Sequence, residues 1–358
     1  MNMVRVFVIR FAFVLFVIGS TSQAFAQDAL KLSGDLRLRQ DMADAENKDA
    51  RNRQRIRARV SLSAEVNDDI TLGIRLATGS DDPVSTNQTL GNGFSSKQFN
   101  IDRAFVTWKP SAISGLALNG GKVKNPFVSP GKTELLWDGD LNPEGFSVNY
   151  KRTVSGLDIF LNASYFSVDE RKADNNAELM GAQAGALFSS DAADIMIGAG
   201  YFDYQNTKSF APIYDATDSF GNSTDVLGNY LYDYDEFELM IEITPGGVLD
   251  GSLIYADYVK NIATDVDDNT GWLIGAKYGS GAFGAAYSFR RVEKDAVLGA
   301  FTDSDFIGGG SDGSGHEVSV KYKLAENVDA GISYFMNKVG VDNGTDYHRV
   351  LADLVLKF

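Results

Sequence analysis

Polar and apolar residues alternate along most of the chain, most clearly between residues 51 and 66, which read RNRQRIRARVSLSAEV. Arginine occupies every second position from Arg51 to Arg59, and from Ile56 to Val66 the intervening positions are apolar. A period of two is the period of a β-strand, whose successive side chains point to opposite faces. The segment is therefore predicted to be a strand with one cationic and one apolar face.

The same period recurs almost to the last residue, and no helical period competes with it after residue 26. Segments with an apolar set at one parity lie at 32–38, 56–66, 70–76, 157–165, 180–188, 195–201, 237–243, 272–278, 283–289, 318–324, 328–336 and 348–358. Weaker examples near 101–108, 116–123, 144–151 and 252–259 bring the predicted strands to about sixteen.

The connections between these strands alternate in length. Short ones lie at 67–69, 110–115, 153–156, 190–194, 245–250, 279–281 and 325–327, and long ones at about 40–51, 79–97, 124–143, 168–177, 205–235, 260–270, 293–315 and 338–346. Short turns on one rim and long loops on the other are typical of a bacterial outer-membrane barrel. The predicted fold is all-β, a single transmembrane antiparallel β-barrel.

A water-soluble β-sandwich would also alternate, with its apolar face turned inward. Two features favour the membrane barrel. The last strand ends on Phe358 at the apolar parity, and aromatic residues stand at strand ends, as in the girdles of such barrels. These aromatic residues are Trp108, Tyr150, Tyr165, Tyr201, Tyr278, Phe289 and Tyr334.

The N-terminus and the charge distribution refine this prediction. Residues 1–26 combine early arginines, an apolar run and the triplet AFA at 24–26, the pattern of a cleaved signal peptide. The exported chain would then be one barrel domain, residues 27–358. The net charge of −15 conceals a basic region between Lys31 and Arg103. Such a local basic wall does not suit nucleic acid, which needs a broad positive face.

The solvent on each side of a barrel wall determines where the arginines point. An arginine facing lipid near the bilayer midplane would cost about 2–4 kcal/mol, so the cationic face must meet water inside a channel. Neighbouring strands lie about 4.8 Å apart, which gathers inward arginines of several strands into one patch. The predicted pore-lining bases are Arg37, Arg39, Arg55, Arg57, Arg59, Arg75 and Arg103.

Together with the signal peptide and the arginine-rich strand, the segments SGDLRLR at 33–39 and WDGDLNPEG at 137–145 resemble Gram-negative porins, especially those described as putative porins. The resemblance implies an outer-membrane channel for passive diffusion of small hydrophilic solutes and ions. It implies a homotrimer in contact with outer-membrane lipid and lipopolysaccharide, with no cofactor. It also implies that the third external loop folds into the lumen, where Glu134, Asp138 and Asp140 would face the arginines across a constriction.

Opposed charges across a constriction would create a transverse field that small polar solutes tolerate. The lumenal bases predict weak anion preference or poor selectivity. Two other interpretations stay open. The charges of residues 124–143, which include Lys124 and Lys132, can belong to a solvated external loop. The channel can also select anionic or sugar-like solutes, since Phe160 and Phe166 share the inward parity of their strand.

The residues do not support catalysis or a dedicated metal site. The two histidines, His316 and His348, have the outward parity near strand starts, so no nucleophile, base and orienting group come together. Residues 265–271, DVDDNTG, resemble the start of a calcium loop but lack the glutamate at its twelfth position. We therefore expect neither an enzyme nor a metalloprotein.

Overall fold

The computed structural model describes residues 30–263, 266 and 268–358. Its strands are β1 (Leu30–Ala45), β2 (Arg51–Asn67), β3 (Ile70–Thr78), β4 (Gln88–Thr89), β5 (Phe99–Trp108), β6 (Leu116–Lys122), β7 (Glu144–Val154), β8 (Leu157–Asp169), β9 (Ala177–Ser189), β10 (Ala193–Gln205), β11 (Tyr234–Pro245), β12 (Ser252–Asn261), β13 (Thr270–Ser280), β14 (Phe283–Val292), β15 (Gly313–Ala325), β16 (Val328–Val339) and β17 (Thr345–Lys357). Short 3-10 turns are η1 (Pro130–Lys132), η2 (Gly247–Leu249) and η3 (Gly299–Phe301). The part of the chain that the structure describes contains no helix with the length and apolar character of a membrane span. The expected signal peptide, residues 1–26, and Asp265 and Asp267 of the calcium-like motif lie outside the described residues.

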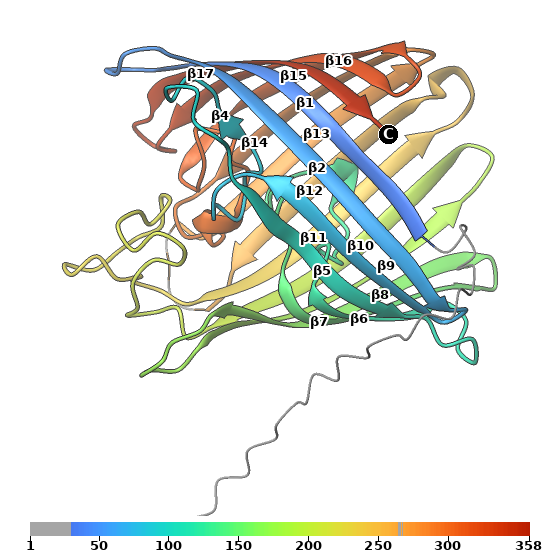
Figure 1. Cartoon of the computed structure of the whole chain (residues 1–358). Helices are drawn as coiled ribbons and strands as arrows, with labels where there is room; N and C mark the ends of the chain where they lie inside the picture. The colour runs from blue at the N-terminus through green and yellow to red at the C-terminus, as the bar shows by residue number, and fades with distance from the viewer. Residues whose placement is uncertain (1–29, 264–265, 267) are drawn as a thin grey trace, which may run out of the picture.

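The strands close into one antiparallel barrel (Figure 1). β1 pairs with β2 on one side and with β17 on the other, and consecutive strands pair around the rest of the circle. The two-residue β4 pairs only with β2, so sixteen strands form the wall, which confirms the prediction. Closure leaves no unpaired edge among the described strands of the wall, as a sheet that faces lipid requires.

The connections alternate in length as the sequence predicts. The long ones include 79–98, 123–143, 206–233 and 293–312. In Figure 1 the connections 79–98, 206–233 and 293–312 lie toward the left end of the barrel, and the short turns lie at the other end with the C-terminus. The first long connection is shorter than predicted, 46–50 instead of 40–51, because β1 and β2 stay paired as far as Ala43 and Arg51. Gln40 and Asp44 interrupt the apolar pattern there without interrupting the backbone ladder.

The two faces of the wall have opposite chemistry. Outward apolar side chains such as Leu38, Leu72 and Ile274 are 46%, 47% and 51% exposed. The inward side chains of Arg39 and Arg57 are only 6% and 11% exposed. An apolar surface that continues around a whole barrel suits hydrocarbon rather than water. The apolar side chains of the alternating pattern therefore point outward and the charged ones inward, as expected for a membrane barrel.

Three long connections share one buried cluster with side chains of one half of the wall, whereas the resemblance to porins implies a contact with the wall only for the third external loop. Leu135 and Trp137 of residues 123–143, Tyr230 of 206–233 and Val297 of 293–312 belong to one buried cluster. The wall residues of this cluster come from β8 to β14 and are Phe166, Ala177, Leu179, Phe202, Tyr204, Tyr234, Tyr255, Val259, Leu273 and Val292. The indole N–H of Trp137 donates to the Tyr204 hydroxyl at 2.8 Å. We call this set the inner apolar cluster.

Candidate functional site

The predicted bases converge on the opposite part of the inner wall, formed by β17, β1, β2, β3 and β5. The antiparallel register pairs Arg37 with Arg57, Arg39 with Arg55, and Arg75 with Arg103. Like charges directly opposite each other destabilise a sheet unless a counter-charge lies nearby. Aspartates from two sources supply that counter-charge, and we call the resulting surface the arginine face.

The first aspartates come from the strands themselves. Asp35 lies opposite Arg59 in the register and accepts hydrogen bonds from Arg59 at 2.7 Å and from Arg57 at 2.9 Å. Asp353 of β17 lies opposite Arg39 and accepts from two nitrogens of its guanidinium, at 2.7 and 2.8 Å. Bidentate pairs of this kind fix the position of an arginine as well as its charge.

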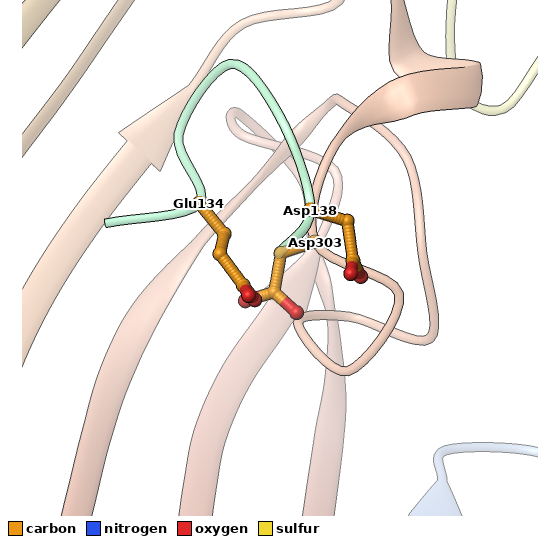
Figure 2. Close-up of side chains that lie close together, drawn as sticks. All are labelled: Glu134, Asp138 and Asp303. Carbon is orange, nitrogen blue, oxygen red and sulfur yellow. The ribbon is translucent and has the colours of Figure 1, made fainter. Parts of the chain in front are cut away.

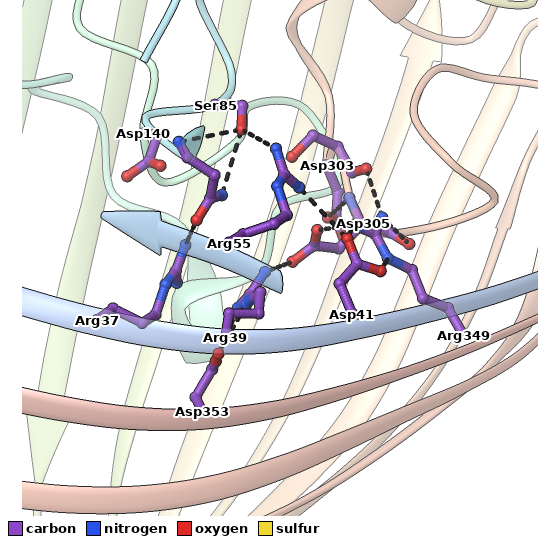
Figure 3. A network of polar contacts seen from close by, with 12 residues as sticks. Arg37, Arg39, Asp41, Arg55, Ser85, Asp140, Asp303, Asp305, Arg349 and Asp353 are labelled. Atoms are coloured by element: carbon purple, nitrogen blue, oxygen red, sulfur yellow. Dashed lines mark hydrogen bonds and ion pairs between the residues drawn. The ribbon is translucent and has the colours of Figure 1, made fainter. Parts of the chain in front are cut away.

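A second network surrounds Asp41 (Figure 3). This buried carboxylate accepts from Arg53 at 2.6 Å and from Arg349 of β17 at 2.9 Å. Asp305, from the long connection 293–312, pairs with Arg349 at 3.1 Å and with Arg39 at 2.9 Å. One external connection is thus tied directly to the arginine face.

Asp140 ties a second connection to the same face. Its carboxylate lies 3.3 Å from Arg59 and 3.7 Å from Arg57, and accepts a hydrogen bond from the Thr86 hydroxyl at 2.8 Å. Burial acts to raise the pKa of Asp140, but Arg57 and Arg59 outweigh burial and hold this pKa below its ordinary value. The carboxylate is therefore ionised at neutral pH.

Glu134 and Asp138 lie in a different place (Figure 2). Their carboxylate oxygens and one of Asp303 lie within 4.8 Å of one another. Asp303 pairs with Arg290 at 2.6 Å. Burial and the neighbouring carboxylates raise the pKa of Glu134 well above its ordinary value. Oxygen ligands suit a hard cation such as Ca²⁺. Of the three acids predicted to face the arginines, Asp140 contacts them, whereas Glu134 and Asp138 form this separate acidic group within the described residues.

Two of the predicted bases have amide partners rather than carboxylates. Arg37 donates to Asn87 Oδ1 at 2.6 Å, and Arg103 donates to Asn142 Oδ1 at 2.6 Å. Neither guanidinium lies within 4.0 Å of a carboxylate in the part of the chain that the structure describes. Arg75, in contrast, pairs with Asp102. Positive charge on the arginine face is therefore least balanced at Arg37 and Arg103.

Residues 123–143 contact opposite sides of the wall. On one side the Gly131 backbone N–H donates to Glu242 of β11, and the Thr133 hydroxyl donates to Asp257 of β12 at 2.9 Å. On the other side Asp140 reaches the arginines of β2. Seven wall strands separate β2 from β11 in either direction around the circle, so these anchor points lie across the barrel from each other.

Several charged residues of the site escaped the sequence-based prediction. Asp35, Asp41 and Arg349 share the inward parity of their strands, and this signal could have identified them. Asp303 and Asp305 carry no such signal, because the 293–312 connection has no period that tells inward from outward. Their positions depend on how that connection packs.

Comparisons with known proteins agree with the barrel architecture. The family model described as putative porin matches residues 38–226 and 223–358, and a search of curated proteins gave no match. A mutant of Rh. blastica porin superimposes with a TM-score of 0.53 at 14% identity, over 92% of this chain and 100% of that chain. A Salmonella typhi OmpF complex with daunomycin superimposes with a TM-score of 0.56 at 14% identity, over 92% and 97%. These structures share the fold, and because the family match extends over most of the chain, the protein belongs to the putative porin family, which indicates a channel rather than an enzyme.

Proposed function

We propose that this protein is a porin of the bacterial outer membrane, a water-filled channel through which small hydrophilic solutes and ions diffuse passively. Residues 123–143 fold into the lumen and narrow it against the arginine face. One observation carries this proposal: the segment is anchored to β11 and β12 through Gly131 and Thr133 and to β2 through Asp140. A segment tied to both sides of a barrel leaves a reduced passage beside it.

The proposed constriction carries charge of both signs and so creates a field across the passage. Most arginines there are neutralised by shared aspartates, so selectivity is weak. The direction of the remaining ion preference follows the bases without a carboxylate partner, Arg37 and Arg103, together with Lys124 and Lys132 of residues 123–143, which we call the inner segment. We therefore propose a weak preference for anions, and the pore-lining role of the seven predicted arginines is part of this proposal.

Selection of anionic solutes is the second candidate function, and it rests on Arg37 and Arg103 alone. A sugar-selective channel has less support. Phe160 and Phe166 are 8% and 1% exposed, and both pack in apolar clusters instead of presenting their rings to a solute. Stacking of a sugar on an aromatic side chain requires an accessible ring face, so these two residues do not supply a sugar path.

The surroundings of the channel follow from its outer surface. The apolar outward face suits outer-membrane lipid, and contact with lipopolysaccharide at the long-loop rim and assembly into homotrimers are part of the proposal. His316, which is half-buried, and His348, which is exposed, lie on this outer face. Nδ1 of each ring lies within hydrogen-bonding distance of a tyrosine hydroxyl, Tyr287 at 2.9 Å and Tyr334 at 3.1 Å. A role for them at the membrane interface agrees with this position.

Conductance measurements test the proposal. Purified protein is inserted into a planar lipid bilayer, and wild type is compared with the triple variant Arg55→Ala/Arg57→Ala/Arg59→Ala. Removal of three long side chains should raise the single-channel conductance and alter the ion preference. Complete absence of conductance from folded wild-type protein would refute the channel function, and an unchanged conductance in the variant would refute the constriction.

A further inference from the structure

We propose that the barrel contains a subsite for small zwitterionic solutes such as α-amino acids, between Lys277 of β13 and Glu317 of β15. This inference rests on the proposed channel function, because a solute reaches the subsite through the lumen. It adds a solute class, one that carries an ammonium and a carboxylate a few bonds apart.

The subsite is a polar cavity of about 220 Å³ lined by residues 131–134, by Asp303 and Asp305, and by side chains of β12 to β17 and of Arg39 on β1. Water occupies roughly 30 Å³ per molecule in the liquid, so the cavity has room for about seven waters. A small amino acid has a similar number of non-hydrogen atoms. The hydroxyls of Thr133, Ser288, Ser319 and Ser333 line the cavity and offer both donors and acceptors.

Charged groups of both signs line this cavity, and four of them, Lys132, Glu134, Lys277 and Glu317, form no ion pair with any residue that the structure describes. Arg290 is paired with Asp303. The Glu317 carboxylate makes no hydrogen bond and no ion pair to any residue that the structure describes. The Lys277 ammonium, which has three N–H donors, donates to the backbone carbonyl of Gly131. Glu134 accepts from the Gly139 backbone N–H, so Glu317 is the lining carboxylate that has neither an ion pair nor a hydrogen bond, and Lys277 is an ammonium with spare donors.

The strand register explains why these two charges do not pair with each other. Across β14, Gly275 aligns with Ser288 and then Glu317, and Lys277 aligns with Ala286 and then Ser319. Glu317 and Lys277 are therefore two strands apart and offset by two residues, which corresponds to about 12 Å between their backbones. The small side chains of Ala286 and Ser288 on the intervening strand leave the space between them open.

A zwitterion carries the counter-charge for each of these two groups. Its carboxylate can accept hydrogen bonds from Lys277 while its ammonium donates to Glu317, and both partly buried charges are then satisfied at once. A simple anion or cation satisfies only one of them and is repelled by the other. A neutral solute of equal size offers hydrogen bonds but no charge, and charge-assisted hydrogen bonds are the stronger kind.

Liposome swelling distinguishes these solutes. At low concentration, wild-type channels should admit L-serine about threefold to tenfold faster than erythritol, a neutral solute of similar size, since two partly exposed ion pairs account for a ratio of this order. The L-serine rate should also saturate as its concentration rises. Lys277→Gln and Glu317→Gln should each bring the ratio of the two rates close to one.

Lys321→Gln is the matched control. Lys321 lies on β15 like Glu317, but outside the cavity, and its 61% exposed side chain pairs with Asp329 at 3.3 Å. Its replacement should leave the ratio unchanged. The charge exchange Lys277→Glu/Glu317→Lys should restore the ratio, because a zwitterion binds equally well in the reverse direction.

The outcomes separate the two proposals. If neither solute enters the liposomes, the channel function itself fails. If wild type admits both solutes at equal rates, or if the ratio survives both single substitutions, the subsite is refuted while the channel function stands. A charge exchange that does not restore the ratio would attribute the loss to altered packing and would also overturn the subsite.

Discussion

Asp140 is the acidic side chain through which the inner segment meets the arginine face, and Asp140→Asn tests that contact. Its carboxylate lies 3.3 Å from Arg59 and 3.7 Å from Arg57. Asparagine keeps the shape and an oxygen acceptor for the Thr86 hydroxyl, which donates to Asp140 at 2.8 Å. The substitution therefore removes one negative charge from the proposed constriction with little change in volume.

The size of the effect follows from screened electrostatics. A unit charge about 6 Å from a passing ion contributes about 0.3 kcal/mol when the dielectric constant of water and a Debye length of about 8 Å apply. This energy has opposite sign for anions and cations. Loss of the Asp140 charge should therefore raise the ratio of anion to cation permeability by about threefold.

The assay is the reversal potential of single channels in a potassium chloride gradient. Asp329→Asn is the control, because Asp329 also accepts from two cations, Lys357 at 2.8 Å and Lys321 at 3.3 Å, but lies at the short-turn end of the barrel. The control should leave the ratio nearly unchanged. A ratio that stays constant in Asp140→Asn, or that moves toward cations, would refute the proposed position of Asp140 beside the passage.

Three further predictions concern the rest of the structure. Trp137→Ala removes a ring from the inner apolar cluster and should lower the free energy of unfolding by about 3–5 kcal/mol, measured by thermal unfolding in detergent. Single-channel currents should also become noisier, because the inner segment loses its hydrogen bond to Tyr204. Because the pKa of Glu134 is raised well above 4.5, its carboxyl releases its proton only as pH rises past that raised pKa. The stability of the fold should therefore decrease as pH rises above 4.5, and the anion preference should be stronger at low pH. Glu134→Gln should weaken both trends, measured by pH-dependent unfolding and by reversal-potential curves. Gly34→Ala places a Cβ against the Arg59 carbonyl and the Phe358 ring and should lower stability by about 1–3 kcal/mol, visible as earlier loss of the folded form in heated gel samples.

The inside of this barrel is divided between two kinds of contact. On β8 to β14, apolar side chains hold three long connections in place, as Trp137 shows beside Phe202 with ring centroids 4.4 Å apart. On β17, β1 and β2, arginines form ion pairs with Asp305 and Asp140 of two of these connections. The apolar half orders the connections, and the charged half presents the groups that a solute would meet.

The sequence by itself determined the strand number, the alternation of short and long connections and the inward direction of the arginines. Each wall residue meets either the outside or the inside, so its direction depends on parity alone, and a period of two can be read locally. This is why Arg55, Arg57 and Arg59 could be placed on the inner face. The boundary of β1 was read less well, because the outward Gln40 and Asp44 hide a ladder that continues to Ala43.

Only the tertiary structure determined which charges meet. Asp138 and Asp140 are two residues apart, yet Asp140 pairs with Arg59 and Asp138 lies with Asp303. The contacts of Arg39 span 266 residues to Asp305 and 314 residues to Asp353. Long connections have no period that tells inward from outward, and their contacts join segments far apart in the chain. Their arrangement depends on the packing of the whole barrel interior, which no local pattern records.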